Sequence, residues 1–143
     1  MKNIEAAIKK KLPDGIWLLE LQLKKGSGFI RLIIDGDKPV TIRDTAIITK
    51  SVKKIEEINS LFSNGYRLEV TTPGLDKKLE HSFQYKKFLS KKLEIISNND
   101  DSENYLDAQL IEVDDTGIRI NDNGCLFALK YNEILSAKPK IEF

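Results

Sequence analysis

Very few of the side chains that enzymes use for nucleophilic or metal chemistry occur in this sequence. It has one cysteine, Cys125, and one histidine, His81, among 143 residues. One cysteine excludes an internal disulfide, and one histidine excludes a His-based triad or a two-histidine metal site within the chain. Cys125 begins an alternating apolar stretch, which favours packing, and His81 lies in a basic segment, which favours hydrogen bonding or helix capping. We therefore expect no catalytic residue.

Ligand-binding motifs are missing as well. The sequence has no Walker A run, no GxGxxG after a strand pattern, and no GXXG loop of the kind that KH-type RNA binders use. The acidic pairs Asp100-Asp101 and Asp114-Asp115 lack the spacing and the distal glutamate of a calcium loop, and solvation of a loop or turn explains them. The sequence therefore predicts no cofactor and no metal ion.

Long apolar runs are absent too. No stretch approaches the length of a membrane span, and residues 1–5 lack the apolar core of a signal peptide. Together with the single cysteine, these absences predict a soluble protein of the reducing cytoplasm.

The first half of the chain alternates between helical and strand periodicity. Apolar residues recur at three- and four-residue steps from Ile4 to Leu12, which is typical of a short amphipathic helix. Thr41, followed three residues later by Asp44, resembles a capping box and predicts the start of a second helix. The expected elements are a helix over 4–12, strands over 17–23 and 29–34, a helix over 41–63 and a strand over 66–70.

This order predicts an αββαβ domain with a KH-like sheet and both helices on one face. The polar outer positions of the strands should then line the uncovered face: Glu20, Gln22, Arg31, Arg67 and Glu69. Such a face is a candidate binding surface, and simple solvation of an open sheet is the alternative interpretation.

The second half consists of short strand-sized segments separated by polar turns. Strands are expected over 93–96, 106–113, 117–120, 125–129 and 134–137, and a polar loop over 97–104. Asn123-Gly124 is the strongest hairpin signal. Closing these strands into a small barrel would remove exposed edges. The fold class is therefore α+β, with an αββαβ domain over 1–76, a basic linker over 77–91 and a small β-barrel over 92–143.

The linker carries an unusual concentration of positive charge. Between Lys77 and Lys92 there are six lysines and one acidic residue, Glu80. Such a belt suits salt-sensitive contacts with phosphates, and a solvated linker is the alternative. The candidate RNA-binding residues are Lys77, Lys78, Lys86, Lys87, Lys91 and Lys92. Phe83, Tyr85 and Phe88 lie among them and either stack on bases or pack the linker onto a domain.

A sharp turn separates the last strand of the first domain from this belt. Proline presets φ for the second position of a β-turn, and glycine tolerates the positive φ that a type II turn needs at the third. Pro73-Gly74 therefore predicts a turn with positive φ at Gly74, and with Asp76 it forms the structural turn between the two domains.

The stretch Leu68-Glu69-Val70-Thr71-Thr72-Pro73-Gly74-Leu75-Asp76, followed by Lys77, resembles the signature of the RimP family, bacterial factors for maturation of the small ribosomal subunit. Further similarity covers residues 30–35, 40–44 and 132–137, together with the aromatic pair Phe83 and Phe88. The resemblance extends over nearly the whole chain.

The resemblance implies an N-terminal αββαβ domain and a C-terminal barrel of the Sm or SH3 type. It further implies a cytoplasmic, non-enzymatic assembly factor that binds the free small (30S) subunit. The implied partners are small-subunit ribosomal RNA and ribosomal protein twelve of that subunit, the latter bound by the barrel. We expect a monomer.

Three residues depart from the family pattern. Lys78 stands where the family usually has proline and Ser90 where it usually has glycine, so the linker is expected to be less rigid. Lys77 replaces a frequent arginine, which removes a bidentate grip on phosphate. A general RNA-binding protein without a ribosomal role and an unrecognised enzyme built on carboxylates or lysines are the alternative functions.

Overall fold

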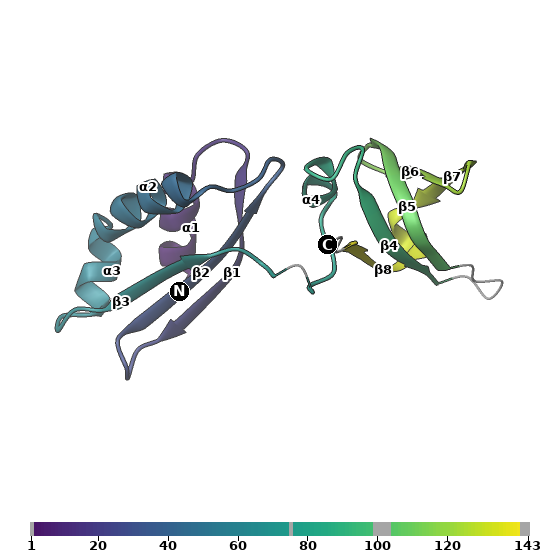
Figure 1. Cartoon of the computed structure of the whole chain (residues 1–143). Coiled ribbons are helices and arrows are strands. Elements are labelled where there is room, and N and C mark those ends of the chain that lie inside the picture. The colour runs from purple at the N-terminus through teal and green to yellow at the C-terminus, as the bar shows by residue number, and fades with distance from the viewer. Residues whose placement is uncertain (1, 75, 99–103, 141–143) are drawn as a thin grey trace. The chain divides into compact units, whose positions relative to one another are not determined.

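The computed structural model describes residues 2–74, 76–98 and 104–140. The chain divides into two compact units, Met1–Pro73 and Gly74–Phe143 (Figure 1). Each unit has its own hydrophobic core. The first combines helices with a three-stranded sheet, and the second is built mainly from an antiparallel sheet. The expected α+β class is confirmed.

The first unit places its helices on one face of a three-stranded sheet (Figure 1). Its elements are α1 (Lys2–Lys11), β1 (Ile16–Lys24), β2 (Phe29–Gly36), α2 (Ile42–Lys53), α3 (Glu56–Leu61) and β3 (Arg67–Thr71). The sheet order is β1-β2-β3, with an antiparallel β1-β2 pair and a parallel β2-β3 pair. Alternate residues Ile30, Leu32 and Ile34 of β2 point into the core, where Ile8 of α1 and Ile48 of α2 cover them.

The expected strands are confirmed, but the helix expected over 41–63 is two helices. The chain leaves the helical conformation at Ile55, whose φ of −75° and ψ of 114° are extended. The Asn59 side-chain amide donates to the Lys53 carbonyl at 3.2 Å and satisfies a backbone group that the break exposes. Ile55 is only 4% exposed, so the bend keeps the apolar stripe of the two helices in the core.

The capping box at the start of α2 is confirmed. The Asp44 amide donates to Thr41 Oγ1 at 3.1 Å, and the Thr41 amide donates to Asp44 Oδ2 at 2.9 Å. Hydrogen bonding of the Thr41 amide, and then of its side chain, to the carboxylate lowers the pKa of Asp44.

The second unit is a five-stranded antiparallel sheet with a short helix. Its elements are α4 (Ser82–Lys86), β4 (Lys92–Ser97), β5 (Asn104–Val113), β6 (Gly117–Asp122), β7 (Cys125–Lys130), a 3-10 helix η1 (Tyr131–Glu133) and β8 (Ile134–Pro139). The strand order is β7-β6-β5-β4-β8. The five expected strands are confirmed, while the KH-like description of the first sheet and the Sm or SH3 barrel remain predictions. Residues 99–103 of the expected loop lie outside the described residues.

The segment expected to be a basic linker, 77–91, contains α4. The Leu79 amide donates to the Ala137 carbonyl at 2.8 Å, and Tyr85 is 3% exposed, with its ring 5.4 Å from that of Tyr131. These contacts attach the segment to the second unit. The exact domain boundaries at 76 and 91 stay a prediction.

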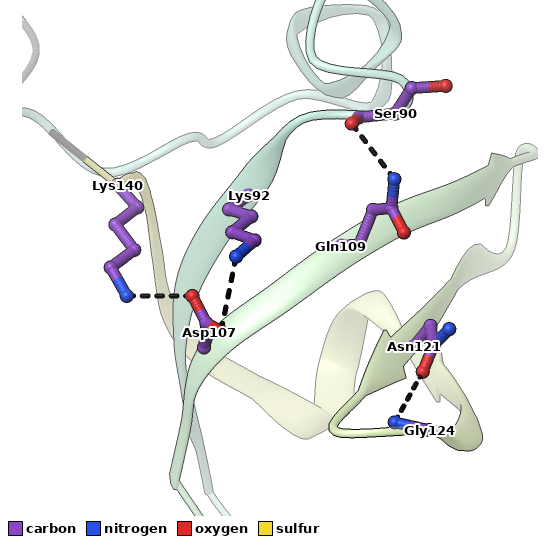
Figure 2. A network of polar contacts seen from close by, with 7 residues as sticks. All are labelled: Ser90, Lys92, Asp107, Gln109, Asn121, Gly124 and Lys140. Atoms are coloured by element: carbon purple, nitrogen blue, oxygen red, sulfur yellow. Dashed lines mark hydrogen bonds and ion pairs between the residues drawn. The ribbon is translucent and has the colours of Figure 1, made fainter. Parts of the chain in front are cut away.

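The hairpin expected at Asn123-Gly124 joins β6 to β7. Both residues have positive φ, 54° and 90°, as the tight turns of two-residue hairpins require. Asn121 Oδ1 accepts a hydrogen bond from the Gly124 amide at 2.9 Å and closes the turn (Figure 2).

The positive φ expected at Gly74 is wrong. The φ of Gly74 lies outside the left-handed region, and the tight turn begins at Gly74, whose carbonyl accepts from the Lys77 amide at 3.0 Å. A Cβ on Gly74 would lie 2.6 Å from Asp76 Oδ1, at the end of a side chain that can rotate away. Leu75 lies outside the described residues. Glycine is therefore not required here by backbone conformation.

We expect Gly74→Ala to change the free energy of unfolding of the second unit by less than about 0.5 kcal/mol, as surface substitutions usually do. Gly124→Ala is the matched control, because Gly124 has open space around its Cβ position and a φ of 90°. It should cost about 1 kcal/mol from φ alone. Urea unfolding of the two variants compares them, and an equal loss at Gly74 would contradict the ordinary backbone conformation.

Ser90 occupies a conformation that glycine normally takes. Its φ is 68°. The Ser90 amide donates to the Leu110 carbonyl at 2.8 Å, and the Ser90 carbonyl accepts from Gln109 Nε2 at 3.2 Å (Figure 2). Both backbone groups are therefore fixed to β5, in contrast to the looser segment expected from a serine at this position.

Ser90→Gly should raise the free energy of unfolding of the second unit by up to about 1 kcal/mol, because the strain of Cβ at positive φ exceeds the entropy that glycine gains on unfolding. Ser90→Ala keeps Cβ and should not stabilise. Thermal unfolding measures both, and stabilisation by alanine equal to that by glycine would exclude backbone strain as the cause.

Candidate nucleic-acid interface

The six candidate lysines all lie in the second unit, around α4. Lys77 and Lys78 precede the helix, Lys86 and Lys87 lie at its carboxyl end, and Lys91 and Lys92 lie at the start of β4. Five are exposed, and Lys87 is half-buried. The cluster follows from the local fold, because α4 is short and the chain enters β4 directly after it.

Strand pairing gives Lys92 an ion-pair partner within the protein. Antiparallel pairing of β4 with β5 brings Lys92 Nζ within 3.3 Å of Asp107 Oδ2, while Lys140 Nζ lies 2.7 Å from Asp107 Oδ1 (Figure 2). The hydrogen bonds from Lys140 and then Lys92 lower the pKa of Asp107, so the carboxylate is ionised at neutral pH. Lys92 is therefore partly neutralised within the protein.

The other lysines differ in their surroundings. Lys87 Nζ lies 5.6 Å from the centre of the Phe88 ring, a cation–π contact. Of the six candidate lysines, four have no ion-pair partner within 76–98 and 104–140, the part of the second unit that the structure describes: Lys77, Lys78, Lys86 and Lys91. These four are the lysines best placed to meet an external anion.

The aromatic residues of this segment pack against the protein. Tyr85 is buried in the second core, where burial and Tyr131 raise the pKa of Tyr85 to about 12. Phe88 packs against the same core, and Phe83 is half-buried, with its ring stacked on His81 at 5.4 Å. Of the two uses considered for Tyr85, the structure shows packing.

The rare reactive side chains, Cys125 and His81, lie on different elements of the second unit. Cys125 was expected to pack, and this was wrong, because it is exposed at the hairpin. His81 lies at the start of α4, where Gln84 Oε1 accepts from the amides of Glu80 and His81, both at 2.9 Å. Among the described residues, no group of three histidine, cysteine or acidic side chains is arranged to hold a metal ion.

The acidic pair at 114–115 was expected to be a solvated turn, and its first residue, Asp114, holds that turn by hydrogen bonds. Asp114 Oδ1 accepts from the Thr116 amide and hydroxyl, both at 2.8 Å, and from the Gly117 amide at 2.9 Å. These bonds hold the turn before β6 and lower the pKa of Asp114. The pair Asp100-Asp101 lies outside the described residues.

The uncovered face of the first sheet carries the polar residues predicted for it. Register places Arg31 between Gln22 and Glu69, and its guanidinium donates to Glu69 Oε2 at 3.2 Å and to Gln22 Oε1 at 3.4 Å. Arg67 lies 4.8 Å from the centre of the Phe29 ring. Most of the charge on this face is thus satisfied internally, which favours the interpretation as a solvated face.

Strand register explains which site residues the sequence did not reveal. Asp107 and Lys140 were not identified from the sequence. Asp107 lies 15 residues after Lys92, and Lys140 lies 33 residues after Asp107. The only signal that could have found them is the pairing of β4 with β5 and β8, which lysine spacing does not contain.

None of the helices in the described ranges has the length and apolar character of a membrane span. A family model described as the RimP N-terminal domain matches residues 4–76. The matched region contains the αββααβ arrangement of the first unit from residue 4 onward and the turn residues Pro73, Gly74 and Asp76. The chain therefore belongs to the RimP family of ribosome maturation factors.

Proposed function

We propose that this protein binds the free small ribosomal subunit in the cytoplasm and assists its maturation without catalysing a reaction. It acts as a monomer, the lysines around α4 contact phosphates of ribosomal RNA, and the second unit, as a small barrel, binds ribosomal protein twelve. Membership of the RimP family supports the ribosomal role. The proposed site residues are supported by the surroundings of the lysines.

The observation that carries the RNA contact is the group of exposed lysines that lack an internal partner. Lys77, Lys78, Lys86 and Lys91 lie within one short stretch, and among the described residues none forms an ion pair. Ammonium groups attract phosphates without reading bases, so these contacts position the protein on RNA rather than select a sequence.

Sedimentation with separated ribosomal subunits tests this function. The protein should move with free small subunits and not with large subunits. Migration with assembled ribosomes but not with free small subunits would overturn the proposal.

A general RNA-binding role is the second candidate, because lysine contacts with phosphates are independent of sequence. Capture from cell lysate separates the two. Enrichment of free small subunits supports the ribosomal role, whereas mixed RNA without subunits supports the general one.

A further inference from the structure

A second group of lysines lies on the first unit, where two helices end. The last turn of α1 contains Lys9, Lys10 and Lys11, and the last turn of α2 is followed directly by Lys54. These segments are far apart in sequence, but both line one groove beside the break between α2 and α3.

We name this groove, lined by Asn3, Ala6, Ala7, Lys10, Lys11, Lys54, Ile55, Glu56 and Glu57, the helix-end groove. Its volume is about 510 Å³. The α1 residues that line it recur at three- and four-residue steps and so form one face of the helix. Alanine at positions 6 and 7 leaves the space between the two sets of lysines open.

The positive charge in the groove comes from the end of α1 and from the residue that follows α2. Lys10, Lys11 and Lys54 are exposed, and within residues 2–74, as far as the structure describes them, none of the three forms an ion pair. Glu56 and Glu57, which follow Lys54 in the sequence, also line the groove and reduce its net positive charge. Lys9 differs from its neighbours, because its Nζ lies 3.3 Å from Glu5 Oε1 and it does not line the groove.

Compensation of helix dipoles explains part of this arrangement. Lysines near a helix carboxyl end stabilise the helix by a few tenths of a kcal/mol each. That effect does not require lysines from two helices to line one open space, and it accounts equally for Lys9, which is paired elsewhere. The convergence of Lys10, Lys11 and Lys54 is the feature that needs a further cause.

We propose that the helix-end groove binds the phosphate backbone of RNA through Lys10, Lys11 and Lys54. The inference rests on the proposed function and adds a contact on the first unit to the lysines around α4. Contacts on two linked units raise the effective concentration of each for a single large RNA.

The lining of the groove favours phosphates over an acidic peptide. A peptide in a groove gains much of its affinity from apolar anchors or strand pairing, and the apolar lining consists of Ala6, Ala7 and Ile55 alone. Phosphates need only charge, which the three ammonium groups supply. Glu56 and Glu57 repel phosphates and so restrict the path of the backbone to the part of the groove that Lys10, Lys11 and Lys54 line.

The test is the salt dependence of binding to purified small-subunit ribosomal RNA and to free small subunits. The variant K10Q/K11Q/K54Q should lower the slope of log K against log salt by about 2 to 3, at 0.7 to 0.9 for each contact. The control K9Q/K25Q/K38Q removes the same charge from exposed positions outside the groove and should change the slope by less than about 1.

Three outcomes would overturn the inference alone. Equal slope changes in both variants would reduce the effect to net charge, and an unchanged slope in K10Q/K11Q/K54Q would exclude the contact while leaving the proposed function intact. The groove would be assigned to an acidic peptide if polyglutamate competed with RNA for the unaltered protein but not for K10Q/K11Q/K54Q, and if this variant kept the RNA affinity of the unaltered protein. Failure of the unaltered protein to bind small subunits would instead overturn the proposed function, and the inference with it. Circular dichroism checks that each variant is folded.

Discussion

Replacing Lys77, Lys78, Lys86 and Lys91 together with glutamine should weaken binding to free small subunits on the order of a hundredfold at physiological salt. If all four meet phosphates, the slope of log K against log salt should fall by about 3. The four positions are exposed, and among the described residues they have no ion-pair partner, so the fold should not change. Titration at several salt concentrations measures the effect.

Lys92→Gln supplies the internal comparison for single substitutions. Because Lys92 is paired with Asp107, its removal should change the slope less than Lys86→Gln does. Asp107 keeps Lys140 as a partner at 2.7 Å, so the substitution does not leave an isolated carboxylate. Equal effects of the two single substitutions would show that the ion pair opens on binding. An unchanged slope in the fourfold variant would assign these lysines to solvation.

Leu32→Ala should reduce the free energy of unfolding of the first unit by about 2 to 5 kcal/mol, the usual range for a buried leucine. Leu32 is 0% exposed and belongs to the first core only. A unit of this size has little stability to spare, so the loss should largely unfold it. Two-dimensional NMR of the whole chain should then lose dispersed signals from 2–73 and keep those from the second unit.

Leu110→Ala provides the reverse experiment, because Leu110 is 0% exposed in the second core. It should unfold the second unit and leave the first. Leu126→Ala is the surface control, since Leu126 is 74% exposed and should change the stability by less than about 0.5 kcal/mol. Loss of both sets of signals in either core variant would contradict two separate cores.

Most of the elements could be predicted from periodicity, and the exceptions have physical causes. The break at Ile55 was missed because the apolar spacing from Ile48 to Phe62 continues through it. A helix can bend at a residue whose side chain stays buried, and hydrophobic spacing does not register such a bend. The Asn59 side chain that satisfies the Lys53 carbonyl is a tertiary feature of the break.

The turn at Gly74 shows a different limit. A Pro-Gly pair predicts a turn, but it does not determine which residue is the first of that turn. The structure starts the hydrogen-bonded turn at Gly74, so the position of positive φ inferred from the pair does not apply.

Some features of the candidate site could be predicted from the sequence, and others depend on the fold. Lysine density in 77–92 was visible in the sequence, and so was the solvated face of the first sheet. The pairing of Lys92 with Asp107 depends on strand register, and the helix-end groove depends on packing of α1 beside the break after α2. Both bring together residues that no local pattern connects.

The order of the elements has a consequence for synthesis of the protein. Every strand pair and helix of the first unit lies before Pro73, and the last pairing in its sheet joins Ile33 to Thr71. A growing chain therefore contains all of this core before the first strand of the second sheet has been translated. Since domains generally fold as units from the amino terminus, the first unit can fold while the ribosome is still adding the second. Its parallel strand pair, the slower kind to form, is then completed without competition from the five strands that follow.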